Sequence, residues 1–299
     1  MLDGSVHPDY ADVASSLVRQ IPPERHAGAA VCVYHEGRSV VDIWGGQKDA
    51  DGNAWESGTI APSFSTSKGV LSTLVHILVD QDRADYSDPV AEHWPDFGAR
   101  GKDGITIRDV LTHRAGLYRI TELIQRPSEM LDWEHMKRLV ADAEPAHTPG
   151  QTSGYHGLTF GWIVGGLIEA ITGKPLETVL HDELVEPLGL DGMYLGVPHN
   201  QLYRRATLAQ GITEPPTAKE EWREALEEWV EIALEKVGVE LAEFRSALAP
   251  FNEPFDWNDE ATVMAKIPAA NGQFTARSLA RMYATVSYTH LTLPTSFLV

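Results

Sequence analysis

The chain has 299 residues, of which 43% are hydrophobic and 22% are charged, a composition that predicts a folded globular protein and excludes a disordered one. Lys and Arg number 24 against 43 Asp and Glu, so the formal net charge at pH 7 is −19. This charge repels phosphate groups and therefore argues against a nucleic-acid partner and against anionic membrane surfaces. The single cysteine, Cys32, excludes an intrachain disulfide and argues against a cysteine-built zinc site.

The sequence also argues against a membrane protein and against a cofactor enzyme. The best apolar run, 161–168, is too short for a membrane span and is interrupted by Glu169. The first residues lack a basic segment followed by an apolar run, so we predict no signal peptide and a cytoplasmic protein. Neither a phosphate-binding glycine loop nor a His-Glu-x-x-His motif occurs, and we therefore expect no cofactor and no metal.

The N-terminal part of the chain predicts a helix followed by a β-hairpin. Apolar residues over 9–19 are spaced for one face of a short helix, which Pro22 ends. Two β-branched runs, 29–34 and 39–44, flank the turn at 36–38. This pattern is typical of two antiparallel strands joined by a tight turn.

Helical periodicity dominates from Ser65 onward. Apolar residues recur at intervals of three and four between Val70 and Val79, and Thr106 is a candidate N-cap for a helix over 106–111. Further helices are predicted over 129–143, 160–171, 174–184, 218–247 and 278–284. Because the strands come first and the helices crowd the middle, we expect an α+β fold. It would have an antiparallel β-sheet flanked by helices and a helical region inserted at about 80–250.

The end of the chain has a different character. Residues 286–299 carry no Asp, Glu, Lys or Arg, and the helical register is lost after Ala284. The string over 286–295 resembles a translated sequencing-library adapter. We therefore expect residues 1–285 to be one incomplete domain and 286–299 to be a non-native tail, in which His290 has no role. The alternative is a genuine apolar C-terminal strand.

Ser65 and Lys68 are a candidate nucleophile and base. Residues at i and i+3 on a helix share one face, with their Cβ atoms about 5–6 Å apart. A free lysine has a pKa of about 10.4, but partial desolvation favours the neutral amine, which can accept the proton of a serine hydroxyl. The apolar helix behind Lys68 is able to supply that desolvation. The structural alternative is a helix N-cap serine with an exposed lysine.

Several blocks accompany this pair in a fixed order: FSTSKG at 64–69, LTHRAGL at 111–117, PGQTSGYHG at 149–157, FGWIVG at 160–165 and PLGL at 187–190. Together they resemble the serine β-lactamase-like superfamily, which includes penicillin-binding proteins, class C β-lactamases and family VIII carboxylesterases. The likeness spans 13–283 and is nearest to the esterase-like branch. It implies a β-lactamase/transpeptidase-like fold and a small-molecule ester as the substrate.

The resemblance implies roles for the central residues. Ser65 would be the acylated nucleophile, Lys68 its proton acceptor, and Tyr155 a phenol beside them that shuttles the proton. The backbone N–H of Ser65 would form one half of an oxyanion hole.

Further residues would border the substrate or support the cleft. His156, Gly157 and Asn271 are predicted to bind substrate, with a structural hydrogen bond as an equal alternative for His156. His113 is expected to be structural.

Two departures from the family pattern bear on function. Gly157 stands where the Tyr-x-Asn motif has the asparagine that helps hold β-lactams, and this favours ester chemistry. The Lys-Thr-Gly motif, whose strand also provides the second oxyanion N–H, is missing, since 172–174 has the same residue types in another order. We therefore expect this chain to lack one wall of its active site and to fold poorly or turn over esters negligibly.

The resulting prediction is a serine hydrolase that cleaves small carboxylic esters through an acyl-enzyme on Ser65. The alternatives are a β-lactamase or D-amino-acid peptidase, an acyltransferase, and a non-catalytic binding module on the same fold.

Overall fold

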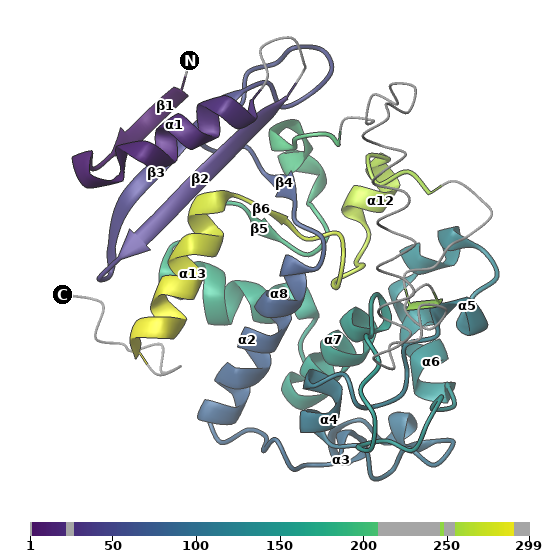
Figure 1. Cartoon of the computed structure of the whole chain (residues 1–299). Helices are drawn as coiled ribbons and strands as arrows, with labels where there is room; N and C mark the ends of the chain where they lie inside the picture. The colour runs from purple at the N-terminus through teal and green to yellow at the C-terminus, as the bar shows by residue number, and fades with distance from the viewer. Residues whose placement is uncertain (1, 22–26, 209–245, 248–254, 290–299) are drawn as a thin grey trace, which may run out of the picture.

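The structure, a computed structural model, describes residues 2–21, 27–208, 246–247 and 255–289. Two small antiparallel sheets adjoin a helical region (Figure 1). The strands are β1 (Leu2–Val6), β2 (Gly28–His35), β3 (Arg38–Gly46), β4 (Ala61–Pro62), β5 (Met193–Tyr194) and β6 (Gln273–Phe274). The α-helices are α1 (Ala11–Gln20), α2 (Thr66–Asp80), α3 (Val90–His93), α4 (Ile107–Leu111), α5 (Ile120–Leu123), α6 (Trp133–Asp142), α7 (Thr159–Thr172), α8 (Leu176–Leu180), α9 (Glu186–Leu188), α12 (Glu260–Met264) and α13 (Ala276–Thr289).

The first sheet has the strand order β1-β3-β2 and confirms the predicted hairpin. Its turn residues, Glu36 and Gly37, both have positive φ, and His35 pairs with Arg38 across the turn. Such a two-residue turn matches the twist of the flanking strands. The sequence did not predict β1, which pairs with β3 along its other edge.

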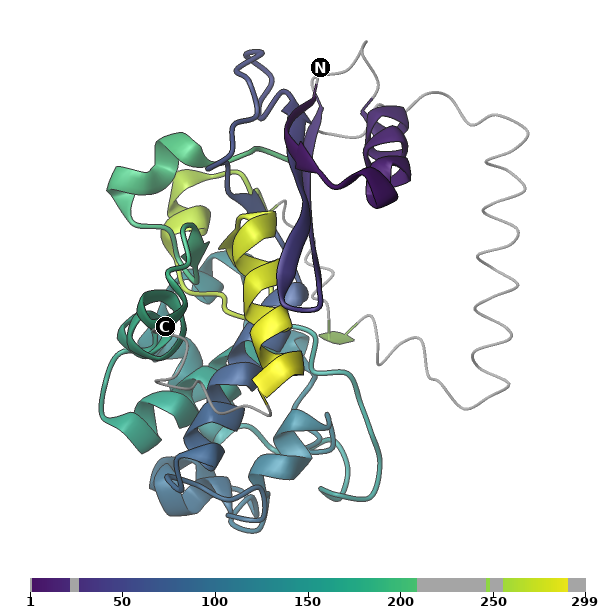
Figure 2. The same cartoon turned by 90° about the vertical axis from the view of Figure 1, so that its left-hand side faces the viewer.

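The first sheet lies between two helices, α1 and α13 (Figure 2). Alternation along β3 explains this arrangement, because successive side chains of a strand point to opposite faces. Val41 and Ile43 are buried in a cluster with Leu17 of α1. Asp42 lies between them in sequence and accepts a hydrogen bond from Nε of Arg277 on α13, at 2.7 Å.

The second sheet has the order β4-β6-β5 and connects distant parts of the chain. Ala61 and Met193 both pair with Phe274, from opposite sides of β6. Each strand is only two residues long, which is too short for an alternating pattern that would predict a strand from the sequence. The sheet holds β4, which leads directly into the Ser65 segment, against residues some two hundred positions later in the chain.

The helical region is built around α2 and α7. Val70, Leu71, Leu74 and Leu78 of α2 are fully buried, which confirms the apolar periodicity found in the sequence. Helix α7 is buried on nearly all sides from Thr159 to Ile168 and ends at Gly173 in the left-handed conformation. These two helices pack on each other and form the centre of the main hydrophobic core.

Two predicted helices are interrupted in the structure. The segment expected as a helix over 129–143 is a 3₁₀ helix, Pro127–Leu131, followed by α6, because Asp132 accepts a hydrogen bond from the His135 N–H and starts a new helix. The helix expected over 174–184 is α8 followed by a π-helix, His181–Val185. The predicted helix over 218–247 lies outside the described residues, apart from its last two positions.

The last helix is longer than the sequence analysis predicted. Helix α13 runs from Ala276 to Thr289, so the helical register is not lost after Ala284. No proline interrupts these positions. Each β-branched or hydroxyl residue here lowers helix stability by only about 0.5 kcal/mol relative to alanine. The Thr285 hydroxyl donates to the Arg281 carbonyl at 2.9 Å, which is compatible with the helical backbone. The origin of 286–299 stays a prediction.

Within the described ranges, no helix has the length and apolar character needed to cross a membrane. Further 3₁₀ helices are Pro8–Tyr10, Pro95–Gly98 and His199–Arg204.

Thr106 caps α4 as the sequence predicted. Its side chain accepts a hydrogen bond from the Asp109 N–H, and Asp109 reaches back to the Thr106 N–H, so a full capping box is present.

We predict that Thr106→Ala lowers the free energy of unfolding by about 1 kcal/mol, measured by urea denaturation. The matched control is Thr112→Ala at the other end of the helix, where the exposed hydroxyl only back-bonds to the Arg108 carbonyl. Equal losses in the two variants would contradict a capping role.

Candidate active site

Ser65 stands at the start of α2 with its side chain exposed. It is the N-cap residue, yet its hydroxyl makes no capping hydrogen bond and is available to other partners. The preceding residue, Phe64, has φ of 41°, a conformation that is uncommon for a large side chain. Within the described part of the chain, the backbone N–H of Ser65 has no acceptor.

Lys68 is buried directly behind Ser65, with 8% of its surface exposed. Its Nζ lies 3.0 Å from the Ser65 Oγ, 2.7 Å from the Gly157 carbonyl oxygen and 3.0 Å from the Ala269 carbonyl oxygen. Burial holds the pKa of the Lys68 amine below its usual value, because desolvation disfavours the charged form. The alternative of an exposed lysine beside a helix cap is therefore wrong.

The two carbonyl groups orient the lysine amine. A carbonyl oxygen can only accept, so two N–H bonds of Lys68 point to Gly157 and Ala269 in every protonation state. The third position points to Ser65. An ammonium donates a hydrogen bond there, and a neutral amine presents its lone pair to the serine hydroxyl.

Tyr155 completes a three-membered cluster. Its Oη lies 2.9 Å from the Ser65 Oγ, and the Lys68 Nζ is 5.0 Å from the centre of its ring. The structure thus brings together the three residues that the sequence analysis named as catalytic, although Ser65 and Tyr155 are 90 positions apart. A hydroxyl, an amine and a phenol in mutual reach can relay a proton.

Gly157 contributes through its backbone. Its carbonyl holds Lys68, and its N–H donates to the Tyr155 carbonyl in a tight turn. With no side chain, Gly157 offers no amide group to a substrate.

His156 is fully buried, and its hydrogen bonds place it in the scaffold instead of the cleft. Its Nδ1 donates to the Gly154 carbonyl at 2.7 Å, and its Nε2 accepts the Leu117 N–H at 3.0 Å. Burial lowers the pKa of the imidazole to about 3, and the nearby His113 contributes to the shift. The structural alternative named for His156 therefore describes this side chain.

The Asn271 side chain is also occupied by the protein itself. Its Nδ2 donates to the carbonyls of Thr262 and Ala265, and its Oδ1 accepts the Ile267 N–H. These bonds brace the loop that carries Ala269 and Gly272. The loop in turn meets α2, since the Gly272 N–H donates to the Ser67 hydroxyl at 3.1 Å. Asn271 thus supports the site from outside the Ser65 cluster.

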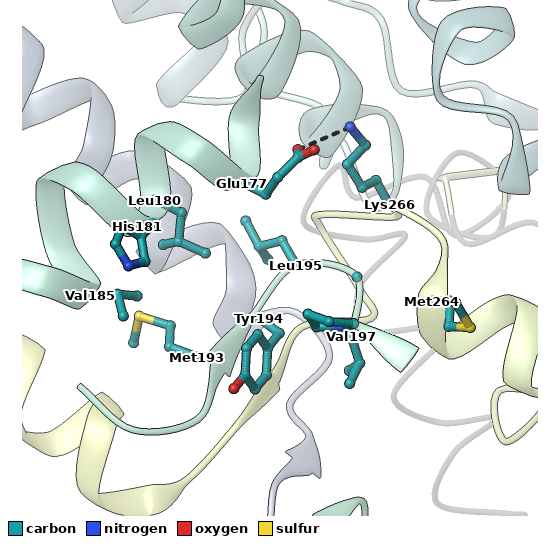
Figure 3. A pocket seen from close by; sticks show the side chains of 12 residues that line it. Glu177, Leu180, His181, Val185, Met193, Tyr194, Leu195, Val197, Met264 and Lys266 are labelled. Atoms are coloured by element: carbon teal, nitrogen blue, oxygen red, sulfur yellow. Dashed lines mark hydrogen bonds and ion pairs between the residues drawn. The ribbon is translucent and has the colours of Figure 1, made fainter. Parts of the chain in front are cut away.

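A separate cavity of about 440 Å³ lies beside β5 (Figure 3). Strand β5 borders it, whereas β4, which leads to Ser65, is at the opposite edge of that sheet. An ion pair between Lys266 and Glu177, at 3.0 Å, bridges one side. None of the Ser65 cluster lines this cavity, so it is not the place of the serine chemistry.

One group of potential metal ligands occurs in the described residues, formed by His181, Asp182 and Glu186. Asp182 is already paired with Lys174 at 2.6 Å, and the group is mostly exposed. We assign no cofactor or metal role to it.

Comparison with known proteins identifies the family of the chain. The sequence profile of the family described as Beta-lactamase matches residues 14–296. The chain belongs to the beta-lactamase family. This confirms the resemblance drawn from the motifs and the β-lactamase/transpeptidase-like fold. The matched range reaches into 286–299.

Proteins similar to this beta-lactamase-family chain include esterases and a penicillin-binding protein homolog. The Esterase/beta-lactamase LipL of Mycobacterium tuberculosis is 36% identical over 286 residues, which cover 95% of this chain and 64% of LipL. A crystal structure of a family VIII carboxylesterase has a TM-score of 0.80 at 28% identity, over 96% of this chain and 72% of that one. A penicillin-binding protein homolog from Caulobacter crescentus has a TM-score of 0.76 at 28% identity with the same coverage. The chain therefore spans 64% of the length of LipL.

The buried His156 makes stability depend on pH. The pKa of this imidazole is about 3 in the folded chain, against an ordinary value of 6.5 that applies to the unfolded chain. Between these two pH values, the unfolded chain therefore binds more protons than the folded chain. The free energy of unfolding therefore falls as the pH drops through this window, by up to about 1.4 kcal/mol per pH unit from this residue. We predict that His156→Gln flattens this slope, as measured by urea denaturation at pH 7, 6 and 5. The control is His199→Gln at an exposed position, and an equal flattening there would refute the assignment.

Proposed function

We propose that this chain is a serine hydrolase that forms an acyl-enzyme on Ser65 and cleaves small carboxylic esters. The observation that carries the proposal is the placement of the Ser65 hydroxyl within hydrogen-bond distance of both the Lys68 amine and the Tyr155 phenol. Its family membership and the esterase names of its relatives support the same reaction class.

The proposed acylation begins with transfer of the Ser65 proton to the neutral Lys68 amine, either directly or through the Tyr155 hydroxyl, which accepts it while passing its own proton to the amine. The serine oxygen then attacks the ester carbonyl carbon, and the carbonyl oxygen becomes an oxyanion. The N–H of Ser65 at the start of α2, which has no acceptor among the described residues, is suited to donate to that oxygen, in the favourable field of the helix N-terminus. When the alcohol leaves, Tyr155 or Lys68 returns the proton to it, and water releases the acid by the reverse relay.

The ester preference rests on Gly157. A substrate amide such as that of a β-lactam side chain gains from a complementary hydrogen-bonding side chain, and glycine provides none at this position. The Gly157 carbonyl accepts a hydrogen bond from Lys68 and so points toward the buried amine. Even at the low turnover expected for this chain, we predict that p-nitrophenyl butyrate is hydrolysed faster than nitrocefin, in side-by-side absorbance assays with Ser65→Ala as the blank. Faster nitrocefin turnover would replace the proposal by a β-lactamase.

The nucleophile is tested by covalent labelling, which needs only a reactive serine and not full turnover. We predict that a fluorophosphonate probe labels Ser65, as located by peptide mass spectrometry, and that Ser65→Ala abolishes the label. The matched control is Ser63→Ala, whose hydroxyl donates to the Ala61 carbonyl two residues away and has no other partner among the described residues. A folded protein without label would support the non-catalytic binding module, and a label on another serine would refute the Ser65 assignment.

The proton-accepting role of Lys68 predicts a pH dependence. Because burial lowers the pKa of this amine, its neutral fraction increases at a lower pH than for a free lysine, and the labelling rate should rise with pH below 10.5.

Lys68→Arg retains a positive charge and donors but cannot accept the proton. We predict a loss of about 10²-fold or more in the labelling rate. A rate within threefold of the wild type would show that positive charge alone suffices.

A further inference from the structure

We propose that His113 is a positioning residue that holds the Tyr155 phenol against Ser65. The proposal rests on the proposed hydrolase function and adds a residue to it. The sequence alone indicated only a structural role for His113.

The His113 ring packs against both Tyr155 and the core. The His113 ring lies 5.1 Å from the Tyr155 ring and 5.2 Å from the ring of Phe160, centre to centre. Phe160 is buried in the main core on α7, so it gives the imidazole a fixed support. The imidazole thus stands between the core and the tyrosine and limits how far the phenol ring can tilt away from Ser65.

His113 also binds the backbone on both sides of Tyr155. Its carbonyl oxygen accepts the Gly154 N–H at 2.9 Å, and its Nδ1 accepts the His156 N–H at 3.2 Å. The two bonds therefore bracket the tyrosine. His113 has φ of 59°, and this left-handed conformation belongs to the same arrangement, in which one residue presents both its carbonyl and its side chain to the 154–156 segment.

The hydrogen-bond directions fix the charge state of His113. Because Nδ1 accepts from a backbone N–H, it carries no proton, and protonation there would break the bond. Lys68, His156 and the Tyr155 hydroxyl are the titratable groups around it. Burial, together with the positive charge of Lys68, lowers the pKa of His113 to about 4. A neutral imidazole adds no second cation next to the catalytic lysine.

Such support matters because proton relays tolerate little displacement. The Ser65 Oγ and Tyr155 Oη are 2.9 Å apart. A misplacement of about 1 Å can cost about 10²-fold in rate even when the mutated residue does not touch the reacting atoms.

The test is a double-mutant cycle with His113→Asn and Tyr155→Phe, read as the rate constant of fluorophosphonate labelling of Ser65. Asparagine tolerates positive φ and retains an acceptor near the Nδ1 position, but it lacks the ring. We expect His113→Asn to slow labelling at least tenfold in the wild-type background and less than twofold in the Tyr155→Phe background. Equal factors in both backgrounds would mean a general structural effect and would overturn the proposal.

The matched control is His147→Asn, the same change at a neighbouring histidine. The His147 ring packs against Tyr118, at 6.0 Å, and is expected to leave the labelling rate within twofold of the wild type. Thermal denaturation checks that each variant is folded. If His113→Asn does not fold, Phe160→Leu is used instead, because it loosens the support of the imidazole. We expect this variant to lose less labelling rate, and to lose it only when the Tyr155 hydroxyl is present.

The two proposals fail in different ways. Absence of label on the folded wild-type protein overturns the hydrolase proposal and this one with it. A labelled wild type together with an unchanged rate in His113→Asn overturns the positioning role alone.

Discussion

The buried amine of Lys68 is the constraint on which the rest of the site depends. Its three hydrogen-bond acceptors come from the start of α2, from the segment after Tyr155 and from the loop before β6. These partners are up to 201 positions away in the sequence, so the amine connects three regions of the chain at one point. If the Lys68 amine were charged and lacked these acceptors, its burial would cost several kcal/mol of folding free energy. The three segments are therefore held in place around the same amine. The resulting geometry directs the remaining bond of the amine to the Ser65 hydroxyl.

Local signals predicted much of the fold, and long-range pairing decided the rest. The hairpin, the apolar faces of α2 and α7, and the cap at Thr106 all depend on residues within a few positions of each other, and all were found in the sequence. Strands β4 and β6 depend on pairing between Ala61 and Phe274, for which a two-residue strand leaves no pattern. The break at Asp132 could have been predicted, since an aspartate that precedes a run of helix formers is a common N-cap.

The candidate site shows the same division. The spacing of Ser65 and Lys68 is local and gave the pair directly, whereas Tyr155 entered only through the resemblance to a family. His156 was expected at the substrate because it follows Tyr155, and Asn271 because the family resemblance places a turn near the cleft at this position. Their backbone partners, such as the Leu117 N–H, are visible only in the folded chain. The Ala269 carbonyl was missed for a related reason, since any residue type supplies a backbone carbonyl.

The most direct test of the account is the mass of the protein during turnover of an ester. We would mix the chain with p-nitrophenyl butyrate, quench with acid at successive times, and follow the butyryl adduct by intact-mass and peptide mass spectrometry. The account predicts a butyryl group on the peptide that contains Ser65, which forms and then decays as the substrate is consumed. Release of p-nitrophenol by the folded protein with no adduct, or with the adduct on another residue, would contradict it.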